Sequence, residues 1–192
     1  MASTKINCAV IGDIIKLNKV VKYIRSQKNF IKYPCLDINS ISIKTFTDAS
    51  FNNLPHGGSQ GGQLIFVTDK SNLSCLVSWN SSKIKRVVRS TLAAETLSLI
   101  EGCDSSYFTI SILEHIYKTK NIKNTIITDN KSLLDTIKTT NLISDKRLRL
   151  EISALREMFN NEEINFRWVS SSNQISDTLT KVGASKNNLA TD

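Results

Sequence analysis

The pattern of hydrophobic and polar positions changes near residue 40, and it predicts a helix before that point and strands after it. In the first part, five apolar residues recur at helical spacing with basic residues between them: Ile14, Leu17, Val20, Val21 and Ile24. From Ile41 to Thr47, apolar and polar residues alternate, as in a half-buried strand. We therefore expect residues 1–40 to form an N-terminal arm and the folded domain to begin at residue 41.

Two further apolar segments, residues 63–68 and 73–79, also have strand character. The polar residues 69–72 between them suit a short turn, so the two segments are expected to pair as an antiparallel hairpin. Trp79 and Trp168 both fall on predicted strands. Packing in the core is the favoured interpretation for both side chains, with base stacking as the alternative.

The rest of the domain alternates helices with strands. Ser90 or Thr91 suits the cap of a long helix, and a final short helix is expected from about Gln174. Four elements lie between them: strand 124–129, helix 132–138, helix 146–160 and strand 164–169. This order predicts an α/β fold with one mixed five-stranded sheet, three antiparallel strands and then two parallel ones, flanked by helices. The domain is expected to span residues 41–181 and to be followed by a tail, residues 182–192.

Four carboxylates are expected at one rim of this sheet. Asp48 and Asp129 each end a predicted strand. If these strands are parallel neighbours, both aspartates lie at the same rim, at the carboxyl ends where α/β proteins place their ligands. Glu95 and Asp177 lie on helices that reach the same rim. Taken singly, these acids also suit turn, cap and solvated helix positions. Together they would repel one another, and a divalent metal is the simplest explanation of such a cluster.

Composition limits the partners. The chain of 192 residues has a net charge of +8 and an isoelectric point near 9.4, which indicates a polyanionic partner such as nucleic acid, although basic proteins can also simply be soluble. The four cysteines lie far apart and form no zinc-binding pattern. No apolar run approaches the ~20 residues of a membrane span, so we expect no membrane partner and an intracellular location, cytoplasmic or nuclear.

Four motifs occur in order: "FTDASF", "SWNSSKIKRVVRSTLAAE", "TDNKS" and "QISDTLTK". In these motifs the segment from Ile41 to Lys181 resembles the ribonuclease H region of copia-type long-terminal-repeat retrotransposon Pol polyproteins. The arm, with "KLNKVVKYIRS", is similar to the stretch that links reverse transcriptase to ribonuclease H in those polyproteins. The resemblance implies a hydrolase that cuts the RNA strand of RNA–DNA hybrids during reverse transcription, association with a reverse transcriptase domain, and a virus-like particle as one cytoplasmic location.

Carried over by position, the resemblance makes Asp48, Glu95, Asp129 and Asp177 the catalytic, metal-binding acids. Hard oxygen ligands suit two Mg²⁺ ions, with Mn²⁺ as a substitute, and two such ions can activate water and stabilise the leaving oxygen. Asp48 is the expected bridge between both ions. Glu95 and Asp129 would complete one site, and Asp177 would support the other.

The sequence departs from the family pattern in two respects. Cellular ribonucleases H commonly carry a histidine in the loop before the last helix, but residues 170–174 contain none. The Tyr-x-Asp-Asp signature of reverse transcriptase is also absent, so we interpret the chain as a fragment, a processed product or a stand-alone remnant. A catalytically silent nucleic-acid-binding remnant of a mobile element is the alternative function, and the intact acids argue against it. An integrase-type nuclease ranks lower because its last acid would be Glu.

Substrate contacts are expected next to the acids. Four basic residues between the third strand and the Glu95 helix are candidates for phosphate contacts: Lys83, Lys85, Arg86 and Arg89. Lys146, Arg147 and Arg149 form a weaker second candidate. Recognition of the 2′-OH of RNA is assigned, by position alone, to Ser50, Asn52 and Asn130.

Overall fold

The computed structural model describes residues 10–27, 31–54, 57–140, 143 and 145–181, and the chain divides into two units, Met1–Lys32 and Tyr33–Asp192. In the first unit the predicted helix is present as α1, Ile11–Ser26, and none of its side chains is buried. The second unit includes residues 33–40, which the sequence pattern placed in the arm. The Cys75 thiol contacts the Pro34 carbonyl, and the N–H of Asp37 donates to the Asp69 carboxylate, so this segment packs along the sheet.

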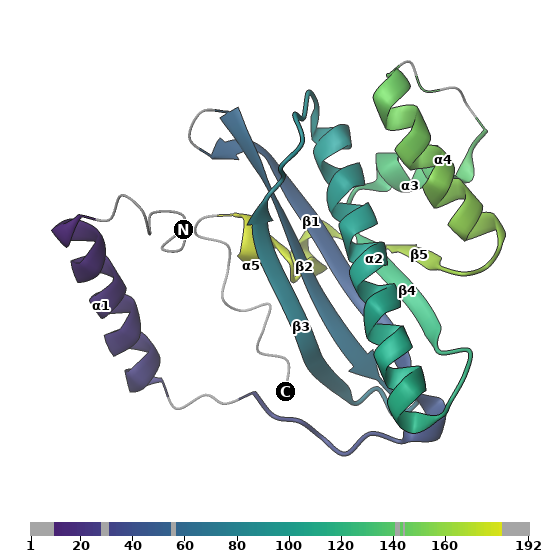
Figure 1. The fold of residues 1–192 in the computed structure, drawn as a ribbon, viewed down its shortest axis with the longest axis horizontal. Helices are drawn as coiled ribbons and strands as arrows, with labels where there is room; N and C mark the ends of the chain where they lie inside the picture. The colour runs from purple at the N-terminus through teal and green to yellow at the C-terminus, as the bar shows by residue number, and fades with distance from the viewer. Residues whose placement is uncertain (1–9, 28–30, 55–56, 141–142, 144, 182–192) are drawn as a thin grey trace. The chain divides into compact units, whose positions relative to one another are not determined.

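The second unit contains the predicted mixed sheet (Figure 1). Its strands lie in the order β3-β2-β1-β4-β5, with antiparallel pairing between the first three and parallel pairing of β4 with β1 and of β5 with β4. The strand bounds are Ser42–Leu54 for β1, Gly58–Thr68 for β2, Ser74–Lys83 for β3, Lys123–Thr128 for β4 and Asn165–Trp168 for β5. The prediction of three antiparallel and then two parallel strands is confirmed.

The helices follow in the predicted order, with one difference at the end. Their bounds are Thr91–Tyr117 for α2, Lys131–Lys138 for α3, Lys146–Asn160 for α4 and Asp177–Thr180 for α5, with 3-10 turns at Ile38–Ser40 and Ser171–Asn173. Ser90 caps α2, since its hydroxyl accepts the N–H of Ala93. The last helix begins at Asp177 rather than near Gln174. Gln174 is extended, and its amide is buried and donates to the carbonyl of Thr47.

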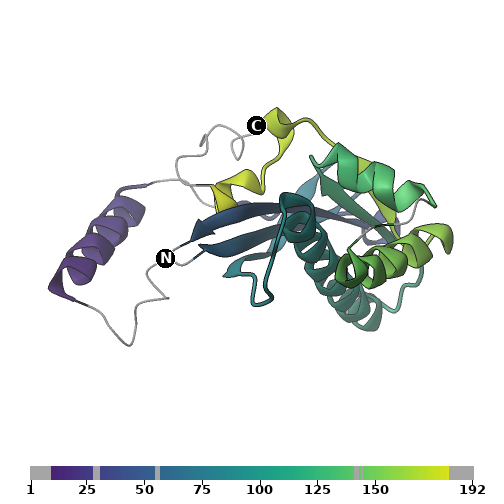
Figure 2. The same ribbon diagram turned by 90° about the horizontal axis from the view of Figure 1, so that it is seen from above.

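The main core lies between the sheet and the helices α2, α3 and α4. Helix α2 packs on β1, β2 and β4, and α4 packs on α2 and α3 (Figure 2). Fully buried residues at these contacts include Leu99, Ile126, Leu133, Ile152 and Leu155. Each such side chain contributes about 1.5–3 kcal/mol through the hydrophobic effect. This apolar layer fixes α2 against the strands that carry the candidate site.

Two adjacent glycines show that the sheet is covered on both faces. A Cβ atom at Gly61 would lie 3.2 Å from the hydroxyl of Ser98 on α2, whereas a Cβ atom at Gly62 would lie 2.8 Å from Thr180 Cγ2 and 2.9 Å from Leu179 Cβ on α5. Because successive residues of a strand point to opposite faces, α5 lies on the face opposite α2. The lack of a side chain at Gly62 lets α5 approach β2 closely.

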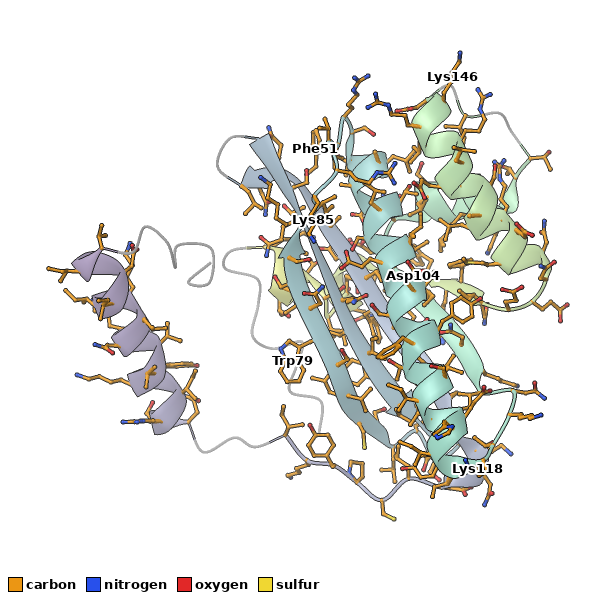
Figure 3. All side chains as sticks on the ribbon, viewed as in Figure 1. Phe51, Trp79, Lys85, Asp104, Lys118 and Lys146 are labelled. Atoms are coloured by element: carbon orange, nitrogen blue, oxygen red, sulfur yellow. The ribbon has the colours of Figure 1, made fainter. Side chains whose placement is uncertain are left out.

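The expectation that both tryptophans pack in the core is wrong. Trp79 is 57% exposed on the outer strand β3 (Figure 3), and Trp168 is 48% exposed at the end of β5. Both strands lie at the edges of the sheet, where less of the structure covers a large side chain. Among the described residues, no helix has the length and apolar character needed to cross a membrane.

Candidate active site

Strand pairing brings Asp48 and Asp129 together. In the parallel pair β1 and β4, Phe46 lies opposite Ile127, so Asp48 and Asp129 are each two residues further along in the same register. Asp48 still lies within β1, opposite Gly62 of β2, and is 1% exposed. Asp129 follows the last residue of β4 and is half-buried. The two carboxylates therefore lie at the same level of neighbouring strands. Asp129 follows the end of β4 as predicted, but Asp48 does not end its strand, because β1 stays paired with β2 as far as Leu54.

Helix α2 brings Glu95 to the same place. Glu95 is 6% exposed, and its carboxylate accepts a hydrogen bond from the backbone N–H of Ala49, the residue after Asp48. One turn later, the Ser98 hydroxyl donates to the Asp48 carbonyl at 2.8 Å. These two contacts fix the register between α2 and β1.

Asp177 is positioned by contacts between α5 and the β1–β2–β3 side of the sheet. The side chains of Gln60 and Ser81 donate to the carbonyl of Leu179 at 3.0 and 2.6 Å, and the amide of Asn53 donates to the Thr180 carbonyl at 3.0 Å. A helix of four residues has little stability of its own, so these long-range bonds fix its position.

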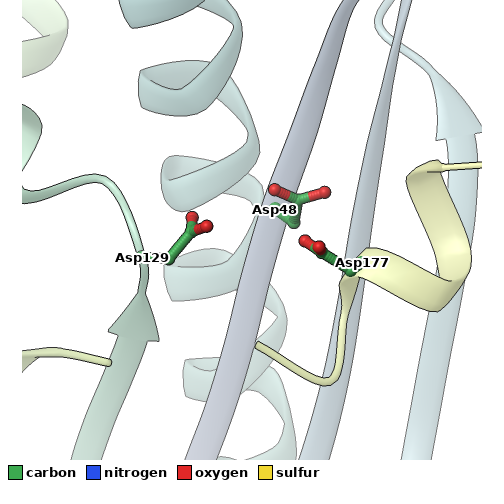
Figure 4. Close-up of side chains that lie close together, drawn as sticks. All are labelled: Asp48, Asp129 and Asp177. Atoms are coloured by element: carbon green, nitrogen blue, oxygen red, sulfur yellow. The ribbon is translucent and has the colours of Figure 1, made fainter. Parts of the chain in front are cut away.

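Three carboxylates meet at this end of the sheet (Figure 4). Asp48, Asp129 and Asp177 each offer an oxygen atom, and these atoms all lie within 4.8 Å of one another. Glu95 is outside this group of three, but it lies close enough on the α2 side for the charges of Asp48 and Asp129 to act on it. Three hard oxygen donors at this spacing suit a divalent cation such as Mg²⁺ or Mn²⁺.

Burial and mutual repulsion perturb these acids. Burial, together with the charges of Asp177 and Asp129, raises the pKa of Asp48 to about 6 despite the opposing effects of Thr180 and Lys181. Burial, together with Asp48 and Asp129, raises the pKa of Glu95 to about 9. Glu95 is therefore protonated at neutral pH when no cation is present. A bound divalent cation would lower the pKa of both Asp48 and Glu95, so these acids fit a metal site.

Four residues at the site were not found by sequence reasoning. Ser171 donates to the Asp129 carboxylate at 2.7 Å, and the Trp168 indole donates to the Asp129 carbonyl at 2.9 Å. Thr180 donates to Asp48 Oδ2, and the Lys181 ammonium lies 2.8 Å from Asp177 Oδ1 and 3.9 Å from Asp48 Oδ1. The four-residue spacing of Asp177 and Lys181 was the available signal for the lysine. No local pattern marks the other three.

The four predicted basic residues lie on the surface at the end of β3 and in the segment that leads to α2. Lys83, Lys85, Arg86 and Arg89 are all exposed. Arg86 forms an ion pair with Glu151 of α4, so part of its charge is already balanced. A cleft of about 260 Å³ lies beside this pair and is also lined by Arg89 and Arg147.

The three residues assigned to the 2′-OH have different surroundings. Ser50 is half-buried in β1, and Asn52 is exposed at an irregularity of the same strand with φ of 56°. Asn130 caps α3, because its side-chain oxygen accepts the N–H of Leu133 at 2.9 Å. Their role toward RNA stays a prediction.

Comparison with protein-family models gives no match, and comparison with curated protein sequences gives none either. Solved structures do match. The N-terminal RNase H domain of a Mycobacterium tuberculosis protein has a TM-score of 0.53 and 17% identity, over 73% of this chain and 91% of that one. LC11-RNase H1, solved in complex with an RNA/DNA hybrid, has a TM-score of 0.52 and 15% identity, over 72% and 94%.

The fold is that of ribonuclease H. RNase H1 from Halobacterium salinarum gives a similar result, with a TM-score of 0.51 and 15% identity over 72% of this chain and 94% of that one. At these identities the likeness shows the ribonuclease H-like fold alone.

Proposed function

We propose that the chain is a metal-dependent endonuclease that hydrolyses the RNA strand of RNA–DNA hybrids. The observation that carries the proposal is the meeting of Asp48 of β1, Asp129 after β4 and Asp177 of α5, with Glu95 of α2 next to them. A hybrid is the proposed substrate because LC11-RNase H1, which has the same fold, was solved with an RNA/DNA hybrid. The basic charge of the chain is consistent with a polyanionic substrate.

The carboxylates are proposed to hold two Mg²⁺ ions. When bound, such ions supply a nucleophilic water and stabilise the leaving oxygen. Asp48 is central because it lies between Asp129 and Asp177, which makes it the proposed bridging ligand (Figure 4). Glu95 would join Asp129 on one side and Asp177 would act on the other. Ser171 and Trp168 orient Asp129 through its carboxylate and its carbonyl.

Substrate affinity is proposed to come from the exposed basic residues between β3 and α2. Lys83, Lys85 and Arg89 are free to contact phosphates, whereas Arg86 would first have to leave Glu151. Such contacts position a substrate without reading its sequence. Ser50, Asn52 and Asn130 are the proposed contacts to the 2′-OH groups of the RNA strand.

The proposed origin is the Pol polyprotein of a copia-type retrotransposon, on the strength of the four motifs. In that setting residues 1–40 derive from the connection to reverse transcriptase, and a reverse transcriptase domain is a proposed partner. The exposed apolar residues of α1 are consistent with a helix that packs against a further domain in the intact polyprotein.

The decisive experiment is a cleavage assay with labelled RNA–DNA hybrid and Mg²⁺. We expect cleavage of the RNA strand by the parent protein, none in EDTA, and none of double-stranded DNA or RNA. Asp48→Asn should abolish cleavage, because it removes a charged ligand without changing the side-chain volume much. Asp104→Asn is the matched control, since Asp104 is exposed on α2 nine residues beyond Glu95 (Figure 3).

Two outcomes of this assay would refute the proposal. Equal cleavage by the parent and by Asp48→Asn would show that the acid cluster is not the site. Tight hybrid binding without any cleavage in Mg²⁺ or Mn²⁺ would instead support the alternative, a catalytically silent binding module.

A further inference from the structure

The Lys181 side chain places a positive charge among the acids of the candidate site. It extends from the end of α5, and its ammonium donates to Asp177 Oδ1 at 2.8 Å and lies 3.9 Å from Asp48 Oδ1. The other oxygen of Asp48, Oδ2, accepts a hydrogen bond from Thr180. Each oxygen of the Asp48 carboxylate therefore has a partner within the chain, Lys181 for Oδ1 and Thr180 for Oδ2.

The charge of Lys181 acts on the whole cluster. It lowers the pKa of Asp48 and, from further away, that of Glu95. In return, although burial favours the neutral amine, the hydrogen bond to Asp177 and the charges of Asp48 and Asp129 raise the pKa of Lys181 above its ordinary value. Among the described residues, Lys181 is the cation that forms ion pairs with the members of this cluster.

From this geometry we propose that Lys181 is an internal counter-ion, which occupies the Asp48–Asp177 side of the cluster and competes with the divalent ion that these two carboxylates would hold. This role rests on the proposed function, since it requires that the cluster binds divalent ions. Two like charges cannot share one carboxylate pair at such short range without strong repulsion. Binding of an ion between Asp48 and Asp177 therefore requires the ammonium to move away.

The exposure and the flexibility of the Lys181 side chain allow this movement. Lys181 is 44% exposed, whereas Asp48 is 1% and Asp177 17% exposed, so the ammonium can swing into solvent while the carboxylates stay in place. Lysine has a flexible four-carbon stem and a compact charge. The Asp129–Glu95 side has no corresponding lysine contact among the described residues, so an ion held there would bind without this competition. The two sides should consequently differ in affinity.

The test is a direct measurement of Mn²⁺ binding to the full chain, with free Mn²⁺ counted by electron paramagnetic resonance. Lys181→Met keeps much of the side-chain volume and removes the charge. We expect the dissociation constant of the weaker Mn²⁺ ion to fall about tenfold or more relative to the parent. In EDTA we expect the same variant to melt at a lower temperature than the parent, because the carboxylates then lack their counter-ion.

Two further variants separate charge from structure. Lys181→Arg keeps the positive charge and should bind Mn²⁺ as weakly as the parent. Lys123→Met makes the same change at an exposed position at the start of β4, opposite Ser42 and away from the cluster, and should bind like the parent. If Lys181→Met fails to fold in EDTA, the Lys181→Arg variant remains a test of the proposal. Tighter Mn²⁺ binding by Lys181→Arg would show that the positive charge at this position does not compete with the metal ion.

The inference and the proposed function fail in different ways. Mn²⁺ affinity in Lys181→Met equal to or weaker than that of the parent would overturn the counter-ion role and leave the nuclease proposal intact. Identical Mn²⁺ binding by the parent and by Asp48→Asn would show that the cluster is not a metal site, and would overturn both.

Discussion

Replacement of Asp48 by Asn should stabilise the metal-free protein at neutral pH while it abolishes the proposed activity. The reason lies in the surroundings of Asp48, which is 1% exposed and lies within 4.8 Å of the oxygens of Asp129 and Asp177. Its folded-state pKa is about 6, against an ordinary value of 3.8. Ionisation of Asp48 therefore opposes folding. The Asn side chain has no such charge and can still accept the hydrogen bond from Thr180.

The expected size follows from the two pKa values. The difference between the ordinary pKa of 3.8 and the folded-state pKa of about 6 corresponds to about 3 kcal/mol in the free energy of unfolding, at about 1.4 kcal/mol per pKa unit. Because the pKa is raised in the folded state, the parent keeps this stability below pH 3.8 and loses it progressively as the pH rises through 6. The advantage of Asp48→Asn should therefore be near zero in acid and reach a plateau of about 3 kcal/mol above neutrality.

Urea denaturation in EDTA, followed by circular dichroism, measures this difference. The free energy of unfolding of parent and variant should be compared at about pH 3.5 and about pH 7.5 by linear extrapolation. Asp104→Asn serves as the control, because Asp104 is exposed and this variant should have the same free energy of unfolding as the parent at both pH values. A variant advantage that is the same at both pH values would refute the reasoning, because the effect would then not arise from the ionisation of Asp48.

Two further predictions concern the metal and the substrate. Binding of Mg²⁺ at about pH 7.5 should release up to one proton from the parent, because burial keeps Glu95 protonated without a cation. The Glu95→Gln variant should release fewer protons. Calorimetry in buffers of different ionisation enthalpy measures the number of protons released. The second prediction neutralises four basic residues together: Lys83, Lys85, Arg86 and Arg89. The salt dependence of hybrid binding should become weaker, by about 0.9 in the slope of log K against log salt for each phosphate that the protein no longer neutralises. An unchanged slope would show that these residues do not contact phosphates. Arg86→Gln alone should have a small effect, since Arg86 is paired with Glu151.

The elements and their order could be predicted from the sequence, because they depend on local periodicity. Alternation between residues 41 and 47 indicated β1, and Ser90 marked the start of α2. The helix before β4 indicates that β4 adds to the sheet as a parallel strand. That its neighbour is β1 was a condition of the sequence prediction, and the structure confirms this pairing, which brings Asp48 close to Asp129. The sequence pattern thus placed two of the four acids at the ends of predicted strands, and the strand order of the structure brought them together.

The remaining features depend on contacts between residues far apart in the chain, and local pattern does not report them. The start of α5 at Asp177 depends on Gln174 bonding to Thr47 and on the close approach to Gly62. Trp79 is exposed because β3 lies at an edge of the sheet, which a strand pattern does not reveal. The raised pKa of Glu95 and the position of Lys181 among the carboxylates arise from burial and from charges on other elements. Hydrophobic periodicity is a property of neighbouring residues, whereas burial and charge pairing are properties of the assembled structure, so only the tertiary fold decided them.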